Sequence, residues 1–326
     1  MPTFKYANPQ LIHWGAGSLQ TLAGELERVG AKRIALITTR SLLGTTLPLE
    51  PHLTAPIAQH APIGQVEGAI KDAREAGVDG IVSFGGGSPI DAAKIVALRL
   101  GGLPHVAVPT TLSVAELAAG AGFTDETRTK GGMRDPGLLP QAVIYDPEVT
   151  LATPMQLWLS SGIRALDHAV EGFLADDEHP FNDVMALEAI RRLFDSLPRA
   201  KAAPEDVAVR TENQIAAWFS FTLPGASAAG LSHTMGKQIG ARHRIPHGVT
   251  SCLLLPHVMR YLAKKKPERT AWLPSADAVY ELIATLALPQ HIAAFGISEP
   301  ELRRAADELG GKYPAGDLLE IYLAAL

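Results

Sequence analysis

Residues 78–100 read VDGIVSFGGGSPIDAAKIVALRL, and this stretch decides the fold. The run 78–84 is short, apolar and rich in β-branched residues, which predicts a buried strand. The run 89–100 places its apolar residues on one helical stripe. Pro89 suits the first helical turn, because the N–H that proline lacks would have no partner there. Between the two runs stand Gly85, Gly86, Gly87 and Ser88, so we predict a strand, a glycine loop and a helix in succession.

The glycine loop has the properties of an anion-binding site. Successive glycines let the backbone approach a ligand without obstruction by Cβ atoms. The following helix directs unpaired N–H groups and its positive dipole end toward the same place, which favours a phosphate. A tight turn that merely needs glycine is the alternative, and the offsets differ from the GxGxxG fingerprint of ordinary dinucleotide-binding folds. We favour anion binding over the simple turn.

The first half of the chain alternates strand-like and helix-like runs. Strands are predicted at 33–38, 78–84, 105–110 and 142–146, and amphipathic helices at 18–29 and 66–76. Such alternation implies a parallel sheet covered on both faces. Ligands of these sheets bind at the carboxyl ends of the strands, where the glycine loop, Thr110 and Thr111 all fall.

The second half changes character, because strand signals largely vanish from about residue 153. Helices are predicted within 154–175, 181–197, 205–221, 232–241, 276–288 and 299–309. The proline steps at Pro147 and Pro154 mark the boundary. We therefore predict an α/β dinucleotide-binding domain over 1–152 and an all-α substrate and catalytic domain over 153–326. The active site is expected in the cleft between them.

Composition restricts the class of function. The chain has 326 residues, of which 47% are hydrophobic and 19% charged, as in a soluble globular enzyme. A net charge of −5 does not indicate nucleic-acid binding, and no apolar run has membrane-spanning length. The single cysteine, Cys252, excludes an internal disulfide and a cysteine-based metal site. We expect a cytoplasmic enzyme whose partner is a small molecule rather than nucleic acid or a membrane.

Polar residues recur at helical spacing in the second half. Arg164 and His168 are four residues apart, as are His233 and Lys237, so each pair shares a helix face. His247 stands where another helix is expected to begin. Three histidines from separate helices are a candidate metal set, but the guanidinium beside His168 would repel a cation. The alternative is that these histidines only satisfy hydrogen bonds within the helical domain.

Five motifs occur in order: GGGSPIDAAK (85–94), VPTTLSVAE (108–116), VIYDPEVT (143–150), SSGIRALDHAVEG (160–172) and LSHTMGKQIGARHRIPHGVTSCLLLP (231–256). Together they resemble the iron-containing, group III alcohol dehydrogenase family over about residues 5–265, and within it the maleylacetate reductase branch. This family shares its architecture with dehydroquinate synthase-like enzymes, an α/β dinucleotide domain followed by a helical domain. The resemblance also implies a homodimer.

The resemblance implies that the first domain binds a nicotinamide cofactor. The family's pyrophosphate loop corresponds to the glycines and Ser88. The start of its next helix corresponds to Asp91 and Lys94, and a loop bordering the cofactor corresponds to Thr110 and Thr111. A carboxylate after the second strand often selects NAD over NADP. That region here is Thr38, Thr39 and Arg40, which contains no carboxylate. We expect NADH, NADPH or both to be used.

The resemblance also bears on metal. The family ligands are an aspartate and three histidines, and the histidines correspond to His168, His233 and His247. The aspartate position is Arg164 here, and a further family histidine is Lys237, so both departures introduce a cation. Maleylacetate reductases likewise lack the aspartate and are understood to work without a required metal. The resemblance implies a metal-independent reductase; any metal that does bind would use the three histidines.

We therefore predict hydride transfer from NADH or NADPH to a small anionic carbonyl or enol substrate. The resemblance implies reduction of maleylacetate to 3-oxoadipate, a step in the degradation of aromatic compounds. Arg164 and Lys237 would stabilise developing negative charge or bind substrate carboxylates, and His168, His233 or His247 would deliver the proton. Structurally, Arg164 could instead pair with Asp167 or Glu171 on its own helix, and Lys237 could be a surface residue.

Three other functions fit part of the pattern. A metal-dependent alcohol or aldehyde dehydrogenase of the same family would require zinc or iron. A dehydroquinate synthase-like lyase would need a metal and more basic phosphate-binding residues than this sequence offers. A non-catalytic dinucleotide-binding protein would retain the glycine loop and show no turnover.

Overall fold

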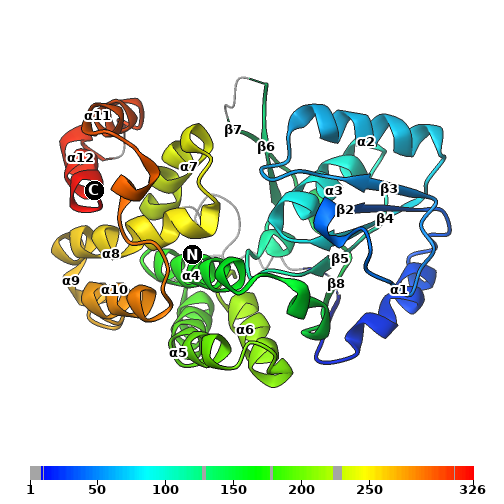
Figure 1. The fold of residues 1–326 in the computed structure, drawn as a ribbon, viewed down its shortest axis with the longest axis horizontal. Helices are drawn as coiled ribbons and strands as arrows, with labels where there is room; N and C mark the ends of the chain where they lie inside the picture. The colour runs from blue at the N-terminus through cyan, green and yellow to red at the C-terminus, as the bar shows by residue number, and fades with distance from the viewer. Residues whose placement is uncertain (1–8, 10, 127–129, 177–178, 223–229, 312) are drawn as a thin grey trace. The chain divides into compact units, whose positions relative to one another are not determined.

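The structure is a computed structural model that describes residues 9, 11–126, 130–176, 179–222, 230–311 and 313–326 (Figure 1). The chain forms two compact units. The first unit contains Met1–Thr153 and Glu205–Trp218, and the second contains Pro154–Pro204 and Phe219–Leu326.

The first unit is built on a six-stranded sheet in the order β1-β8-β5-β4-β2-β3, in which every neighbouring pair is parallel. Its strands are β1 (Leu11–Trp14), β2 (Ile34–Thr38), β3 (Leu53–Pro56), β4 (Gly80–Gly85), β5 (His105–Pro109) and β8 (Ala142–Tyr145). The predicted parallel α/β domain is confirmed. The short strands β1 and β3 were not expected, nor was the antiparallel hairpin of β6 (Gly120–Thr124) and β7 (Lys130–Arg134).

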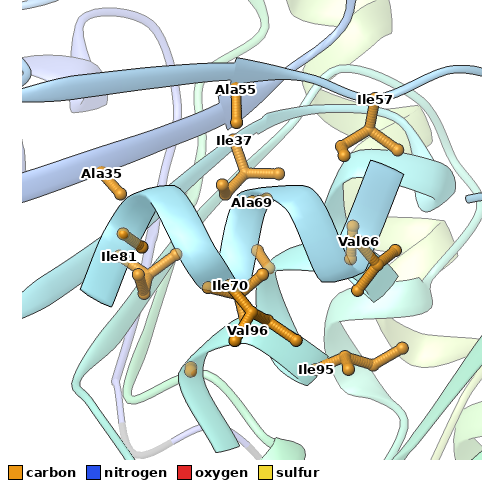
Figure 2. Close-up of a cluster of buried hydrophobic side chains, with 14 of the residues drawn as sticks. Ala35, Ile37, Ala55, Ile57, Val66, Ala69, Ile70, Ile81, Ile95 and Val96 are labelled. Atoms are coloured by element: carbon orange, nitrogen blue, oxygen red, sulfur yellow. The ribbon is translucent and has the colours of Figure 1, made fainter. Parts of the chain in front are cut away.

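Helices cover both faces of this sheet. Successive residues of a strand point to opposite faces of the sheet. On one face, Ile37 of β2 and Ile81 of β4 pack against α2 (Ile63–Glu75) and α3 (Gly87–Arg99). Figure 2 shows this cluster, with Ile70 of α2 and Val96 of α3 beside the strand residues. The opposite face is covered by a short 3-10 turn (Ser18–Thr21) and α1 (Leu22–Arg28). The predicted helix 18–29 therefore exists, with its first turn tightened.

The sheet changes direction between β2 and β4. From β2 the chain proceeds outward to the edge strand β3, whereas from β4 it proceeds to β5 on the other side. The carboxyl ends of β2 and β4 thus flank the topological switch point, where open parallel sheets bind their ligands. The Thr38 hydroxyl joins the two ends by donating to the Phe84 carbonyl oxygen over 2.8 Å.

The second unit is helical, and none of its described residues lies in a strand. Its helices are α4 (Met155–Phe173), α5 (Pro180–Ala202), α7 (Leu231–His243), α8 (His247–Lys265), α9 (Pro267–Thr270), α10 (Ala276–Thr285), α11 (Glu299–Glu308) and α12 (Ala315–Ala324). Helix α4 packs against α5, α7 and α8 and is buried all round from Trp158 to Phe173. No helix in the described part of the chain is long and apolar enough to span a bilayer.

Helix α6 (Val207–Phe219) departs from the sequence division, because residues 205–218 belong to the first unit. Buried Arg210 donates from Nη1 to the Thr150 carbonyl over 2.8 Å. Trp218 packs with Trp14, their ring centroids 6.1 Å apart. Helical periodicity alone assigned this segment to the second half, but tertiary contacts decide where it packs.

Candidate active site

The glycine loop connects β4 to α3. Strand β4 ends at Gly85 and α3 begins at Gly87, which leaves Gly86 as the N-cap residue. Since glycine has no side chain to cap the helix, the first-turn N–H groups need partners from elsewhere. The strand, glycine loop and helix are arranged as predicted, and anion binding at the loop stays a prediction.

The glycines are also required by packing. Gly85 has φ +144°, and a Cβ atom there would lie 2.8 Å from Pro89 Cγ. A Cβ at Gly86 would meet Thr111 Cγ2 at 3.1 Å, and one at Gly87 would meet Ser113 Oγ at 3.3 Å. The simple turn explains Gly85. The missing side chains of Gly86 and Gly87 instead allow the loop after β5 to pack closely against them.

The predicted cofactor residues gather at the carboxyl ends of three adjacent strands. Thr39 follows β2, the glycines follow β4, and Thr110 and Thr111 follow β5. The Thr110 N–H donates to the Gly85 carbonyl over 2.9 Å, which fixes two of these segments together. Thr39 is half-buried, and its hydroxyl lies 3.0 Å from Ser41 Oγ.

Ser88 and Asp91 hold neighbouring segments against the loop. Ser88 Oγ accepts a hydrogen bond from the His60 N–H over 2.9 Å, and Asp91 Oδ2 accepts one from the Gly122 N–H over 3.0 Å. These contacts give both side chains a structural task beside the cofactor role expected of them.

Two buried ionisable side chains lie near the loop, Lys94 in α3 and Glu116 in the segment after β5. Lys94 is fully buried and donates to the carbonyl oxygens of Ala115, Ala118 and Gly120, and burial lowers its pKa. Burial raises the pKa of Glu116 to about 7, and its Oε1 accepts from the Tyr145 hydroxyl over 2.8 Å. Sequence reasoning did not single out Glu116, and only its place inside a motif could have drawn attention to it.

In the second unit, three helices bring the predicted histidines together. His168 lies on α4, His233 in the first turn of α7, and His247 at the first residue of α8. Ring centroids are 5.9 Å apart for His168 and His233, and 6.3 Å apart for His233 and His247. His168 is buried, whereas the other two are half-buried.

Arg164 is buried and paired within its own helix. Its Nη1 donates to Asp167 Oδ2 and to Ser251 Oγ, both over 3.1 Å. This is one of the structural alternatives that the sequence left open. Burial raises the pKa of Asp167, although the Arg164 charge opposes that shift. Arg164, Asp167 and Glu171 form one buried stripe of α4, at spacings of three and four residues.

Lys237 lies one helical turn beyond His233 on α7. It is half-buried, and no described residue forms an ion pair with it. Its ammonium group therefore has no charge partner within the described part of the chain, in contrast to the Arg164 guanidinium.

The donor set fits a divalent metal poorly. The position one turn before His168 holds a guanidinium, which offers no lone pair and repels a cation. Among the described residues, no three His, Cys, Asp or Glu side chains are placed to hold a metal ion.

Comparison with known proteins defines the class. Residues 9–147 match the model of iron-containing alcohol dehydrogenase, and residues 158–310 match that of the Fe-containing alcohol dehydrogenase family, C-terminal. The chain belongs to the iron-containing alcohol dehydrogenase family and is an NAD(P)-dependent oxidoreductase. The predicted family and fold are confirmed.

Within the family, the chain is similar to maleylacetate reductases. It is 34% identical to that of Pseudomonas sp. (strain P51), over 96% of this chain and 93% of the relative. For the enzyme of Rhizobium sp. (strain MTP-10005) the values are 32%, 94% and 91%. The crystal structure of maleylacetate reductase from Agrobacterium tumefaciens has a TM-score of 0.89 at 29% identity, covering 100% of this chain and 99% of that one.

Proposed function

We propose that the protein is a metal-independent maleylacetate reductase that uses NADH, NADPH or both. The carrying observation is the histidine cluster with Arg164 beside it, in a chain similar to maleylacetate reductases over nearly its whole length. The residues of the glycine loop would hold a nicotinamide cofactor, which would supply a hydride to one carbon of the substrate C=C bond. The electron pair of that bond moves toward the conjugated carbonyl oxygen, and a proton then completes the other carbon to give 3-oxoadipate.

The first unit would bind the cofactor through backbone groups. The N–H groups at the start of α3 and the helix dipole would hold the pyrophosphate. No carboxylate follows β2 to repel a 2′-phosphate, and the side chain of Arg40 is exposed there. We therefore expect NADPH to be accepted as well as NADH.

The cationic residues of the second unit would bind the substrate and stabilise charge on its oxygen. Arg164 already uses Nη1 for Asp167 and Ser251, so any substrate contact falls to its other nitrogens. Lys237, half-buried and without an ion-pair partner among the described residues, suits a substrate carboxylate. A histidine of the cluster would deliver the proton, because imidazole ordinarily titrates near neutral pH.

The test measures NADH and NADPH oxidation with maleylacetate, using protein assayed for metal, with and without chelator. Chelator-resistant turnover by metal-free protein is expected. Activity that is lost with chelator and restored by zinc or iron would establish the metal-dependent alternative instead. Cofactor binding without turnover of maleylacetate or any other carbonyl compound would favour a non-catalytic protein. If the protein also fails to cyclise the substrate of dehydroquinate synthase, the lyase is excluded as well.

The proposal extends to a homodimer in the cytoplasm, as the family resemblance implies. Light scattering coupled to size-exclusion chromatography would give the mass in solution directly, for comparison with the 34.6 kDa of one chain. A mass that remains at one chain across the concentration range would remove this part of the proposal.

A further inference from the structure

Glu171 is a buried carboxylate of α4 that contacts the beginning of another helix, α7. Its Oε1 accepts hydrogen bonds from the Ser232 N–H and, at 3.3 Å, from the His233 N–H. Its Oε2 accepts one from the Gly230 N–H over 3.1 Å. The first N–H groups of a helix have no partner within it, and the N-cap residue Gly230 has no side chain to supply one. Glu171 therefore caps α7 from outside that helix.

Gly230 shows how closely this carboxylate is seated. A Cβ atom at Gly230 would lie 2.5 Å from Glu171 Cδ, a separation that real side chains do not tolerate. The absence of a side chain at the N-cap is what admits the carboxyl group of Glu171. The two residues form a matched pair, one on each helix.

The first turn that Glu171 caps also carries His233. His233 is the third residue of α7, and its Nδ1 is buried with no hydrogen-bond partner among the described residues. On that side the imidazole has no bond of its own to orient it. The ring contacts His168 and His247, and its backbone N–H is one of those that Glu171 binds.

Asp167, one turn earlier on the same stripe, reinforces the arrangement. Its Oδ2 accepts from Ser232 Oγ over 3.0 Å and from Ser251 Oγ over 2.6 Å. Ser232 belongs to α7 and Ser251 to α8, so α4 holds both of the other histidine-bearing helices through buried carboxylates.

We propose that Glu171 is a positioning residue for His233, acting through the first turn of α7 rather than by contact with substrate. This inference rests on the proposed function, since it assigns His233 a part in proton delivery. It predicts that Glu171 and His233 act as one unit, so that the loss of either removes most of what the other contributes.

The test is a double-mutant cycle between Glu171→Ala and His233→Asn, read as kcat for maleylacetate reduction. Glu171→Ala is expected to lower kcat at least about tenfold with the KM for NADH unchanged, and Glu171→Gln to recover part of the loss through its remaining acceptor oxygen. In the His233→Asn background, Glu171→Ala is expected to change kcat less than about twofold. If Glu171→Ala does not fold, Glu171→Gln takes its place in the cycle.

The matched control is Glu301→Ala, which removes a side chain capping α11, where Glu301 Oε2 accepts from the Ser298 N–H over 2.8 Å. That variant is expected to leave kcat within about twofold of the parent. Equal effects of Glu171→Ala in the two backgrounds would overturn the proposal, because independent residues give additive free energies.

A second readout does not depend on turnover. In protein labelled with ¹⁵N-histidine, with the His233 signals assigned through His233→Asn, Glu171→Gln is expected to move the His233 ring resonances and leave those of exposed His52 in place. Unmoved His233 resonances would overturn the positioning role. If the parent protein reduces no maleylacetate, the proposed function fails, and the ring resonances still decide the role of Glu171.

Discussion

The Arg164 guanidinium lies 3.1 Å from the Asp167 carboxylate, and both side chains are buried within one turn of α4. The positive charge that replaces the family's anionic ligand is thus compensated by a neighbour on the same helix. Removing one member alone would leave a buried charge without its partner, which is the costly case for such pairs.

Arg164→Ala is therefore expected to affect both activity and stability. We expect kcat/KM to fall at least about tenfold, ~1.4 kcal/mol, through loss of charge stabilisation. We also expect the free energy of unfolding to fall by about 3–5 kcal/mol, because Asp167 stays buried without its cationic partner. Steady-state kinetics and urea denaturation measure the two effects.

The double variant Arg164→Leu/Asp167→Asn separates these effects. It is expected to regain much of the stability, since neither member of the buried Arg164–Asp167 pair is left charged without the other, while kcat/KM stays low. Arg199→Ala, at an exposed ion pair of α5, is the control and should change neither quantity appreciably. A folded Arg164→Ala with unchanged kinetics would show that the residue is purely structural.

Arg164→Asp is expected to create a metal site. The substitution removes the guanidinium that repels a cation and places a carboxylate one turn before His168, so that the side chains of the cluster are of the types that zinc binds. We expect about one zinc per chain by elemental analysis after dialysis, and loss of that zinc when His233→Asn is added. Equal zinc content in the parent protein and the variant would contradict the account of Arg164 as the residue that prevents metal binding.

Gly86→Ala is expected to weaken cofactor binding. The added methyl group would lie 3.1 Å from Thr111 Cγ2, so it must displace the loop after β5 or intrude on the ligand side. We expect the Kd for NADH, followed by nicotinamide fluorescence, to rise at least about tenfold, ~1.4 kcal/mol. Gly64→Ala in α2 is the control, because its Cβ would meet nothing within 4 Å. An unaltered Kd for Gly86→Ala would show that close packing of Thr111 against Gly86 is not required for cofactor binding.

Glu116 is expected to make stability depend on pH. Burial raises the pKa of this carboxyl from 4.5 to about 7 in the folded chain, so the folded state holds the proton more tightly than the unfolded state. The stability contributed by the protonated group is complete below pH 4.5 and is lost as the pH rises through about 7.

Glu116→Gln should remove this dependence. The difference in unfolding free energy between pH 5 and pH 8 is expected to shrink by about 2–3 kcal/mol, measured by urea denaturation. Glu75→Gln, at an exposed position of α2, serves as the control and should preserve the parent's pH dependence. An unchanged difference in Glu116→Gln would mean that Glu116 is ionised in the folded chain at both pH values.

Sequence periodicity predicted the elements that carry a strong local signal. The strand, glycine loop and helix of residues 78–100 appear as expected, because a buried apolar run and an amphipathic helix each leave a pattern of fixed period. Strand β3 is a four-residue edge strand, and the β6–β7 hairpin is rich in glycine, so neither presents such a pattern. Contacts between distant segments leave no period at all, which is why the packing of α6 was not predicted.

In the candidate site, too, contacts within one helix could be predicted and contacts between helices could not. Helical spacing placed Arg164 beside His168 and offered Asp167 as its partner, since both relations lie within one helix. The contacts of Asp167 with Ser232 and Ser251 join three helices and could not be read from spacing. Ser232 lies next to His233 in the motif of residues 231–256, yet only the fold shows that it joins α7 to α4.

Because residues 205–218, with most of α6, belong to the first unit, the gene cannot simply be cut into fragments that encode the two units. The chain passes from one unit to the other three times, after Thr153, Pro204 and Trp218, so no single cut yields two complete units. A fragment ending at Thr153 would lose the Arg210 contact with Thr150 and the Trp218 ring beside Trp14. Anyone wishing to study dinucleotide binding in isolation would need to supply residues 205–218 as well, on a separate peptide or through a designed linker.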